Sequence, residues 1–245
     1  MIDRLYSDHH LASLYDAWWP RSQRKDADFY LPLVMSAEAV LDAGCGTGAM
    51  LHEARQSGHK GRLCGLDPAA GMLSQARKRR DIEWVLGDLA SITWEREFDL
   101  VVMTGHAFQA LIEDEEIRKS LAASRRALRN RGRFAFETRN PLARAWDHWT
   151  PENAEVTGAD GATVRITTRV DTPFDGRIVS FTHTFTGAAW TQPQLSRSTL
   201  RFLDPDSLST FLGEAGFVIE EQFGDWNRQP LANSSPEIIS IAGEQ

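Results

Sequence analysis

The stretch Val40-Leu41-Asp42-Ala43-Gly44-Cys45-Gly46-Thr47-Gly48 decides the fold. A short apolar run over residues 38–42 leads into alternating glycines, and apolar residues at helical spacing follow over residues 47–56. Glycines at such a turn allow tight backbone geometry and let a ligand approach the main chain without meeting a Cβ atom. The stretch therefore predicts a buried strand, a ligand-binding loop and a helix.

The alternation of strand and helix continues toward the carboxyl terminus. The pattern predicts strands at 62–66, 82–86, 98–103 and 133–137, and helices at 70–79 and 114–129. The last of these helices begins with acidic residues and ends with arginines, as the helix dipole favours. Such alternation predicts a parallel sheet covered by helices on both faces.

The pattern changes after residue 140. Three stretches alternate with a period of two, at 163–170, 177–186 and 196–203, and Asp175-Gly176 is a hairpin turn signal. A helix at 205–215, with Asp204 as its N-cap, and strands at 217–223 and 237–242 follow. We therefore expect four parts: an N-terminal helical cap (1–36), a cofactor-binding α/β core (37–140), an inserted antiparallel β lid (141–203) and a completion of the core (204–245).

The composition narrows the class of protein. The chain has 245 residues, 42% hydrophobic and 25% charged, with a formal net charge of −7. These values exclude disordered and fibrous classes, and the acidic balance argues against a nucleic-acid partner. No apolar run reaches the roughly 18–20 residues of a membrane helix, and no signal peptide precedes the first charged residues. Two cysteines, Cys45 and Cys64, suit a reducing compartment, so we expect a cytoplasmic protein. The oligomeric state stays open.

Three acidic residues separate the possible cofactors. Asp42 lies two residues before the first glycine, where it would repel the pyrophosphate of a dinucleotide but attract the cationic groups of S-adenosylmethionine. Asp67 ends the next predicted strand and can accept hydrogen bonds from ribose hydroxyls, and Asp88 follows the third strand, where it suits an adenine edge. Gly44 and Gly46 with Ala49 also satisfy G-x-G-x-x-G/A, so an NAD(P)-dependent oxidoreductase stays an alternative.

These residues resemble the class I S-adenosylmethionine-dependent methyltransferases of the small-molecule type. The matching stretches are 40–48, 65–68 with Met72-Leu73, 87–89, 98–102 and 128–137, and the ending at 204–217 and 238–242 is also similar. The resemblance implies a Rossmann-like, doubly wound, mostly parallel sheet of seven strands whose last strand is antiparallel. It also implies direct displacement of the methyl group from S-adenosyl-L-methionine by a small-molecule nitrogen or oxygen. A non-catalytic module that only binds this cofactor is a further alternative.

The same resemblance implies which residues hold the cofactor. Asp42 would lie near the methionine part, with Gly44 and Gly46 beneath the cofactor, while Asp67 would hold the ribose. The full set of expected cofactor-binding residues is Asp42, Ala43, Gly44, Gly46, Asp67, Pro68, Met72, Asp88, Leu89 and Met103, together with Arg24, whose guanidinium can meet the methionine carboxylate.

The residues after the fourth predicted strand bear on the acceptor. The segment 103–109 lacks the Asn/Asp-Pro-Pro-aromatic run of enzymes that methylate nucleobase or glutamine amino groups, and it has no carboxylates for a divalent ion, so we expect no metal. His106 is the candidate catalytic residue, as a general base or an acceptor-positioning group. A loop histidine bonded to backbone is the alternative, because an amine acceptor needs only in-line positioning.

Aromatic residues concentrate outside the predicted core. Six of the eight tryptophans lie outside residues 37–140, and every tyrosine lies within the first thirty residues. We expect an aromatic-walled acceptor pocket that favours a flat or cationic substrate. Tyr15 and Trp18, on an amphipathic N-terminal helix, Trp146 and Trp190 are its expected residues, and ordinary lid packing is the alternative.

Overall fold

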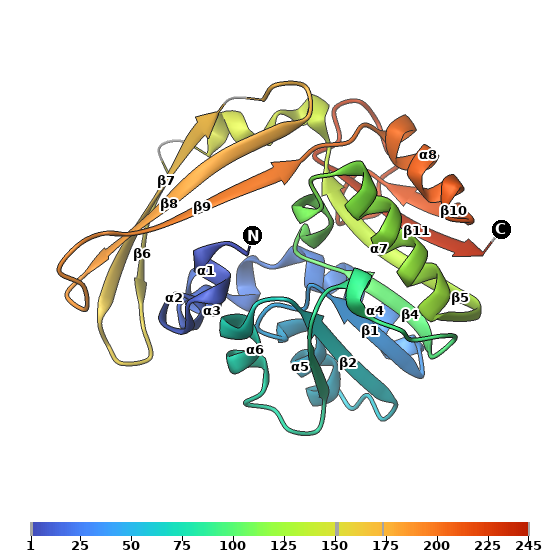
Figure 1. Ribbon diagram of the computed structural model, residues 1–245, viewed down its shortest axis with the longest axis horizontal. Helices are drawn as coiled ribbons and strands as arrows, with labels where there is room; N and C mark the ends of the chain where they lie inside the picture. Colours follow the sequence, from blue (N-terminus) through green and yellow to red (C-terminus); the bar gives the residue numbers. More distant parts are fainter. Residues whose placement is uncertain (1, 150–151, 173, 245) are drawn as a thin grey trace.

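The computed structural model describes residues 2–149, 152–172 and 174–244, and its main element is a seven-stranded sheet (Figure 1). The order is β10-β11-β5-β4-β1-β2-β3. Only β11 runs antiparallel to its neighbours, β5 and β10, so the predicted mostly parallel sheet with an antiparallel last strand is confirmed. The strands are β1 (Ala39–Ala43), β2 (Arg62–Asp67), β3 (Glu83–Leu86), β4 (Phe98–Met103), β5 (Leu128–Arg139), β10 (Phe217–Phe223) and β11 (Glu237–Glu244).

Helices cover both faces of this sheet. On one face, α7 (Asp114–Ala127) and α8 (Pro205–Glu214) pack against the side of β1 that carries Leu41. On the other face, α4 (Lys25–Ser36) and α5 (Ala49–Gln56) pack against Val40. Successive strand residues enter opposite cores, which explains the uninterrupted apolar run of a strand buried on both faces. The remaining helical segments are α6 (Ala70–Ala76), η1 (Arg21–Gln23), η2 (Leu89–Ser91), η3 (Ala107–Ala110), η4 (Pro141–Ala143) and η5 (Ala145–His148).

The predicted boundary between the helix at 114–129 and the strand at 133–137 was wrong. The helix expected to reach residue 129 ends at Ala127, and β5 begins at Leu128, five residues before the expected start. Leu128 pairs with Phe98, and Arg131 adopts a left-handed φ of 64° just before Gly132, so the strand contains an irregular turn that no period-two pattern reveals.

The N-terminal segment forms three short helices where one was expected: α1 (Arg4–Ser7), α2 (His9–Ser13) and α3 (Tyr15–Trp18). Asp8 interrupts the helix because its side chain accepts hydrogen bonds from the backbone of His10 and Leu11 and so starts α2. The segment lies close against α6, since a Cβ atom on Gly71 would lie 2.5 Å from the Tyr6 carbonyl oxygen.

A second, four-stranded antiparallel sheet extends over these helices (Figure 1). Its strands are β6 (Glu152–Thr157), β7 (Thr163–Thr172), β8 (Ile178–Gly187) and β9 (Gln194–Arg201). β6 was not predicted; it is an edge strand rich in polar residues and pairs only with β7 among the described strands. The sheet shares a hydrophobic cluster with the cap, in which Trp18 packs against Phe185. The Leu5 backbone N–H also donates to Ser196 Oγ at 2.7 Å, and the Ser198 hydroxyl donates to Asp3.

Candidate active site

The glycine loop after β1 leaves main chain open to a ligand. Gly44, Gly46 and Gly48 have φ angles of 79°, 55° and 77°, a region that disfavours other residues. A Cβ atom on Gly44 would lie 2.7 Å from the Ala107 Cβ atom, whereas one on Gly46 would meet no described atom within 4 Å. Gly44 is therefore required for close packing beneath η3, and Gly46 presents its backbone to open space.

Asp42 ends this strand as a buried carboxylate with no partner. Its side chain is 1% exposed, and neither oxygen accepts a hydrogen bond within the described part of the chain. Burial raises the pKa of Asp42 to about 7; the nearby Arg24 opposes this rise, and Asp67 and Asp26 add to it. A buried charge without a partner is costly, so this position fits a cationic ligand group. The ammonium and sulfonium of S-adenosylmethionine meet that requirement.

Asp67 lies at the end of the adjacent strand, β2. Its two carboxylate oxygens accept hydrogen bonds from the backbone N–H groups of Gly46 and Ala69, both at 2.8 Å. Burial raises the pKa of Asp67, and these two bonds oppose the rise. Each oxygen keeps a further lone pair, so the carboxylate can hold the glycine loop and still accept ribose hydroxyls.

Replacing Asp67 with alanine is expected to weaken S-adenosylmethionine binding at least tenfold, because the loop and the ribose both lose an acceptor. Titration calorimetry measures the dissociation constant. Asp175→Ala is the matched control, since Asp175 also accepts two backbone hydrogen bonds, from Arg177 and Ile178, but lies in the β7–β8 turn. Equal affinities of Asp67→Ala and the wild type would contradict the assignment.

The other expected cofactor residues differ in exposure. Met72 is buried and packs with Ala69 against Tyr6 and Tyr15. Asp88 is exposed and caps η2 by accepting from the Ser91 backbone. Ala43, Leu89 and Met103 are buried in the core between the sheet and α7, and Pro68 is exposed.

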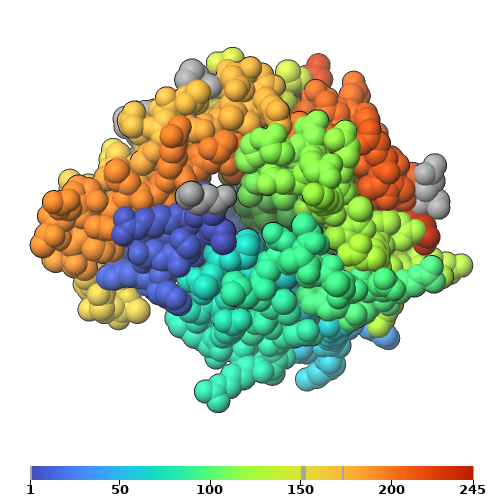
Figure 2. Space-filling view, in the orientation of Figure 1, coloured from blue at the N-terminus to red at the C-terminus, as the bar shows by residue number. Residues whose placement is uncertain are grey.

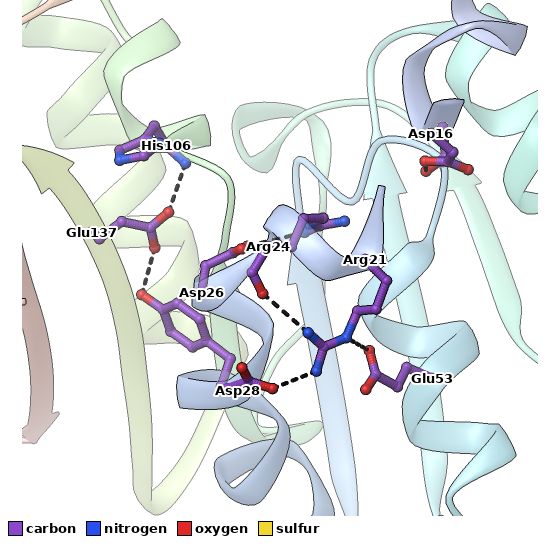
Figure 3. A network of polar contacts seen from close by, with 10 residues as sticks. Asp16, Arg21, Arg24, Asp26, Asp28, Glu53, His106 and Glu137 are labelled. Atoms are coloured by element: carbon purple, nitrogen blue, oxygen red, sulfur yellow. Dashed lines mark hydrogen bonds and ion pairs between the residues drawn. The ribbon is translucent and has the colours of Figure 1, made fainter. Parts of the chain in front are cut away.

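Arg24 lies at the start of α4, beside Asp42. Its Nη2 donates to Asp26 Oδ2 at 3.0 Å, and the two side chains are only 18% and 12% exposed. Burial lowers the pKa of Arg24, but the charges of Asp26, Tyr15 and Asp42 and the hydrogen bond to Asp26 leave it raised. Figure 3 shows Arg24 and Asp26 beside a second network, in which Arg21 binds Asp28 and Glu53.

His106 lies after β4 in a polar cluster formed by distant segments. Its backbone N–H donates to Glu137 Oε1 at 2.7 Å, and Tyr30 donates to Glu137 Oε2 at 2.5 Å (Figure 3). Its Nε2 lies 2.9 Å from Glu237 Oε2, so the ring donates to the carboxylate. Burial raises the pKa of Glu137 to about 7, and His106 and Tyr30 oppose that rise. His106 also has a left-handed φ of 62°, which is unusual for a residue with a side chain.

Sequence reasoning missed the partners of His106. Glu137 and Glu237 are register partners of Ile239 and Arg139 across β5 and β11, whereas Tyr30 comes from α4. Nothing local in the sequence connects these residues with His106. The only available signal was that acidic residues stand where two strands of the predicted sheet end or begin.

The expected acceptor-pocket residues fall into two aromatic groups. Trp18 lies against His183 and Phe185 of the lid, with Tyr15 nearby in the cap. The Trp190 ring is tilted against the His10 ring, with the ring centroids 4.8 Å apart. Trp146 packs with Phe174 and Phe202 in a separate cluster of the lid. The acceptor pocket therefore stays a prediction.

Two other tryptophans lie closer to the polar cluster. The Trp226 ring is 6.4 Å from the His106 ring, and the Trp149 ring is 5.2 Å from the Arg139 guanidinium carbon. Figure 2 shows a hollow between the N-terminal helices in blue, the lid strands in orange and the green segment that follows β4.

Across the described ranges, no group of three or more histidine, cysteine, aspartate or glutamate side chains is arranged to hold a metal ion. In that same part of the chain, no helix is long and apolar enough to cross a membrane.

Residues 40–132 match the protein family described as "Methyltransferase domain". A curated relative, the cypemycin N-terminal methyltransferase of a Streptomyces species, is 32% identical over 110 residues, which cover 44% of this chain and 44% of that relative. The match with this relative thus spans less than half of either protein.

Solved structures extend the similarity of fold to almost the whole chain. The structure of the CcbJ methyltransferase from Streptomyces caelestis superposes on this chain with a TM-score of 0.76 and a sequence identity of 22%. The superposition covers 98% of this chain and 97% of the CcbJ chain. The S-adenosylmethionine-bound amino pentose methyltransferase CalS10 from Micromonospora echinaspora has a TM-score of 0.72 and 21% identity, covering 94% and 96%. Residues 40–132 thus resemble a methyltransferase domain, and the fold of almost the whole chain is similar to that of solved S-adenosylmethionine-dependent methyltransferases.

Proposed function

We propose that the chain transfers a methyl group from S-adenosylmethionine to a nitrogen or oxygen atom of a small-molecule acceptor. The unpartnered carboxylate of Asp42 carries this proposal, because the pyrophosphate of a dinucleotide would meet a negative charge there. Asp67 and the Gly44–Gly46 backbone would hold the rest of the cofactor, and Arg24 would bind the carboxylate of the cofactor.

The net charge of −7 supports an acceptor other than a nucleic acid. Cys45 and Cys64 are both free and buried, which is consistent with a location in the reducing cytoplasm.

When bound, the cofactor supplies a methyl group on a positively charged sulfur, ready for direct displacement. The protein's task is then to orient the acceptor in line and to take up its proton. The hydrogen bond to Glu237 places a proton on Nε2 of the His106 ring, and Nδ1 makes no hydrogen bond within the described residues. Nδ1 is therefore the atom that would accept a proton from the acceptor.

The charges around His106 favour a nitrogen acceptor. Glu237 and Glu137 both bind His106, and the Trp226 ring lies 6.4 Å from the His106 ring, so a protonated amine would be attracted there before it loses its proton. The similarity in fold to an amino pentose methyltransferase supports the same choice.

The test is a titration followed by a turnover assay. We expect S-adenosylmethionine to bind in calorimetry, NADH and NADPH to show no binding, and a panel of small amines and alcohols to include one that releases S-adenosylhomocysteine. Binding of NADH instead would favour the oxidoreductase. Cofactor binding without release for any acceptor would favour the regulatory module.

Replacing His106 with asparagine is expected to lower kcat about tenfold with a productive acceptor, because the proton acceptor is lost. The dissociation constant of S-adenosylhomocysteine should change less than twofold, and Glu237→Gln should shift the acidic limb of the pH–kcat profile. His148→Asn is a control, since His148 is an exposed histidine in η5. A His106→Asn variant with unchanged kcat would show that methyl transfer here needs no base.

A further inference from the structure

Arg139 is a half-buried cation that forms no ion pair within the described residues. It ends β5 opposite Glu237 in the register with β11, yet the two side chains turn to different partners. Glu237 binds His106 at 2.9 Å, whereas Arg139 Nη1 donates to the neutral amide oxygen of Gln109 at 2.9 Å. Within the described residues, no carboxylate lies within ion-pair distance of the guanidinium. Burial lowers the pKa of Arg139, and the charges of Glu237 and Glu137 only partly oppose this.

The rest of the guanidinium remains available. Nε and Nη2 donate to no described group, and neither nitrogen is sealed from the surface as Nε of Arg201 is. The Trp149 ring lies 5.2 Å from the guanidinium carbon, so one partner of the planar group is aromatic. A guanidinium that has two free N–H donors can bind a carboxylate in bidentate fashion, and an aromatic ring beside it can pack against the guanidinium plane.

Two tyrosines of the N-terminal cap lie near Arg139. The charge of Arg139 acts on both Tyr6 and Tyr15, and that of Arg24 also acts on Tyr15, so Tyr15 is near both arginines. Tyr6 and Tyr15 have no hydrogen bond from their hydroxyls within the described residues, and their ring centroids are 6.1 Å apart.

We infer that Arg139 binds a carboxylate group of the methyl acceptor. This inference rests on the proposed function and names the acceptor class: a small molecule that carries both a carboxylate and a nucleophilic group, as an amino acid does. The carboxylate pairs with Nε and Nη2 of Arg139, and the nucleophilic group faces His106. Gln109 holds the guanidinium in place, because its amide nitrogen also donates to the Arg201 carbonyl oxygen at 2.8 Å.

The test compares two probes that differ only in charge. 4-Fluorophenylacetate and its neutral amide, 4-fluorophenylacetamide, are titrated into the full chain saturated with S-adenosylhomocysteine, and 19F NMR gives both dissociation constants. We expect the carboxylate to bind at least tenfold more tightly than the amide to the wild type. Arg139→Met should abolish this preference. Arg139→Lys, which keeps the charge but loses the planar fork, should retain part of it.

Arg144→Met is the matched control, because Arg144 is an exposed arginine that binds Asp147 in the next segment. It should keep the full preference. Equal binding of the two probes by the wild type, or a preference that survives in Arg139→Met, would overturn the inference. A large loss of S-adenosylhomocysteine affinity in Arg139→Lys would also overturn it, because the guanidinium would then belong to the cofactor site. Failure of the proposed function is a separate result, namely no binding of S-adenosylmethionine to the wild type.

Discussion

Replacing Asp42 with asparagine is expected to weaken S-adenosylmethionine binding about 100-fold. The variant removes a carboxylate that is 1% exposed and has no partner within the described chain, so the cationic ligand loses a buried counter-charge. Hydrogen bonds between charged groups contribute about 1.5–3 kcal/mol each, which corresponds to a loss of this size. Titration calorimetry measures the affinity. Asp99→Asn is the control, since Asp99 is the second residue of β4, at the amino end of the strands, and accepts a hydrogen bond from the Ala39 backbone.

The same variant should be more stable than the wild type when no cofactor is bound. Burial raises the pKa of Asp42 from its ordinary value of 3.8 to about 7 in the folded chain. Below pH 3.8 the protonated side chain therefore does not reduce the free energy of unfolding. The free energy of unfolding falls as the pH rises from 3.8 to 7, and above pH 7 the loss is complete. Urea unfolding at pH 8 should give Asp42→Asn a higher free energy of unfolding, with the difference shrinking toward pH 4. A variant that is less stable at pH 8 would contradict the unpaired carboxylate.

Replacing Glu137 with alanine is expected to reduce the free energy of unfolding by about 3 kcal/mol. The change leaves the Tyr30 hydroxyl and the His106 backbone N–H without a buried acceptor, and each unsatisfied group costs about 1–3 kcal/mol. Urea unfolding at pH 7 measures this loss. The loop that carries His106 loses its anchor at the same time, so kcat should also fall.

Glu137→Gln is the informative companion to this variant. Its amide oxygen can accept from His106, and its amide nitrogen can donate to the Tyr30 oxygen, so both contacts persist without the charge. We expect its free energy of unfolding to lie within about 1 kcal/mol of the wild type. If the glutamine variant were as unstable as Glu137→Ala, the charge rather than the two hydrogen bonds would hold the loop.

The parts of the fold that follow from local pattern were predicted correctly. The bounds of β4 and β10 match the expected strands, because their apolar residues and flanking polar residues define them directly. β6 was missed because an edge strand buries little and its polar residues carry no clear periodicity. The N-terminal helix was expected to be continuous because hydrophobic spacing does not show that Asp8 caps a new helix.

The candidate site likewise contains residues that could be predicted from the sequence and residues that could not. Asp42 and Asp67 could be predicted because each stands at the carboxyl end of a predicted strand, Asp42 just before the glycine loop and Asp67 at the end of the next strand. Their roles toward the cofactor stay predictions. Glu137 and Arg139 could not be chosen, because their importance depends on Tyr30, His106 and Gln109, which approach them only through the tertiary fold.

The hydrogen bonds between the first helix and β9 join segments about as far apart in the sequence as this chain allows. Leu5 binds Ser196, and Ser198 binds Asp3, while the same helix lies against Gly71 of α6. The helix that covers α6 cannot move outward without breaking these bonds or carrying β9 with it. The first helix thus joins β9 of the second sheet to α6 of the core, and a displacement of either one would strain the contacts of the other.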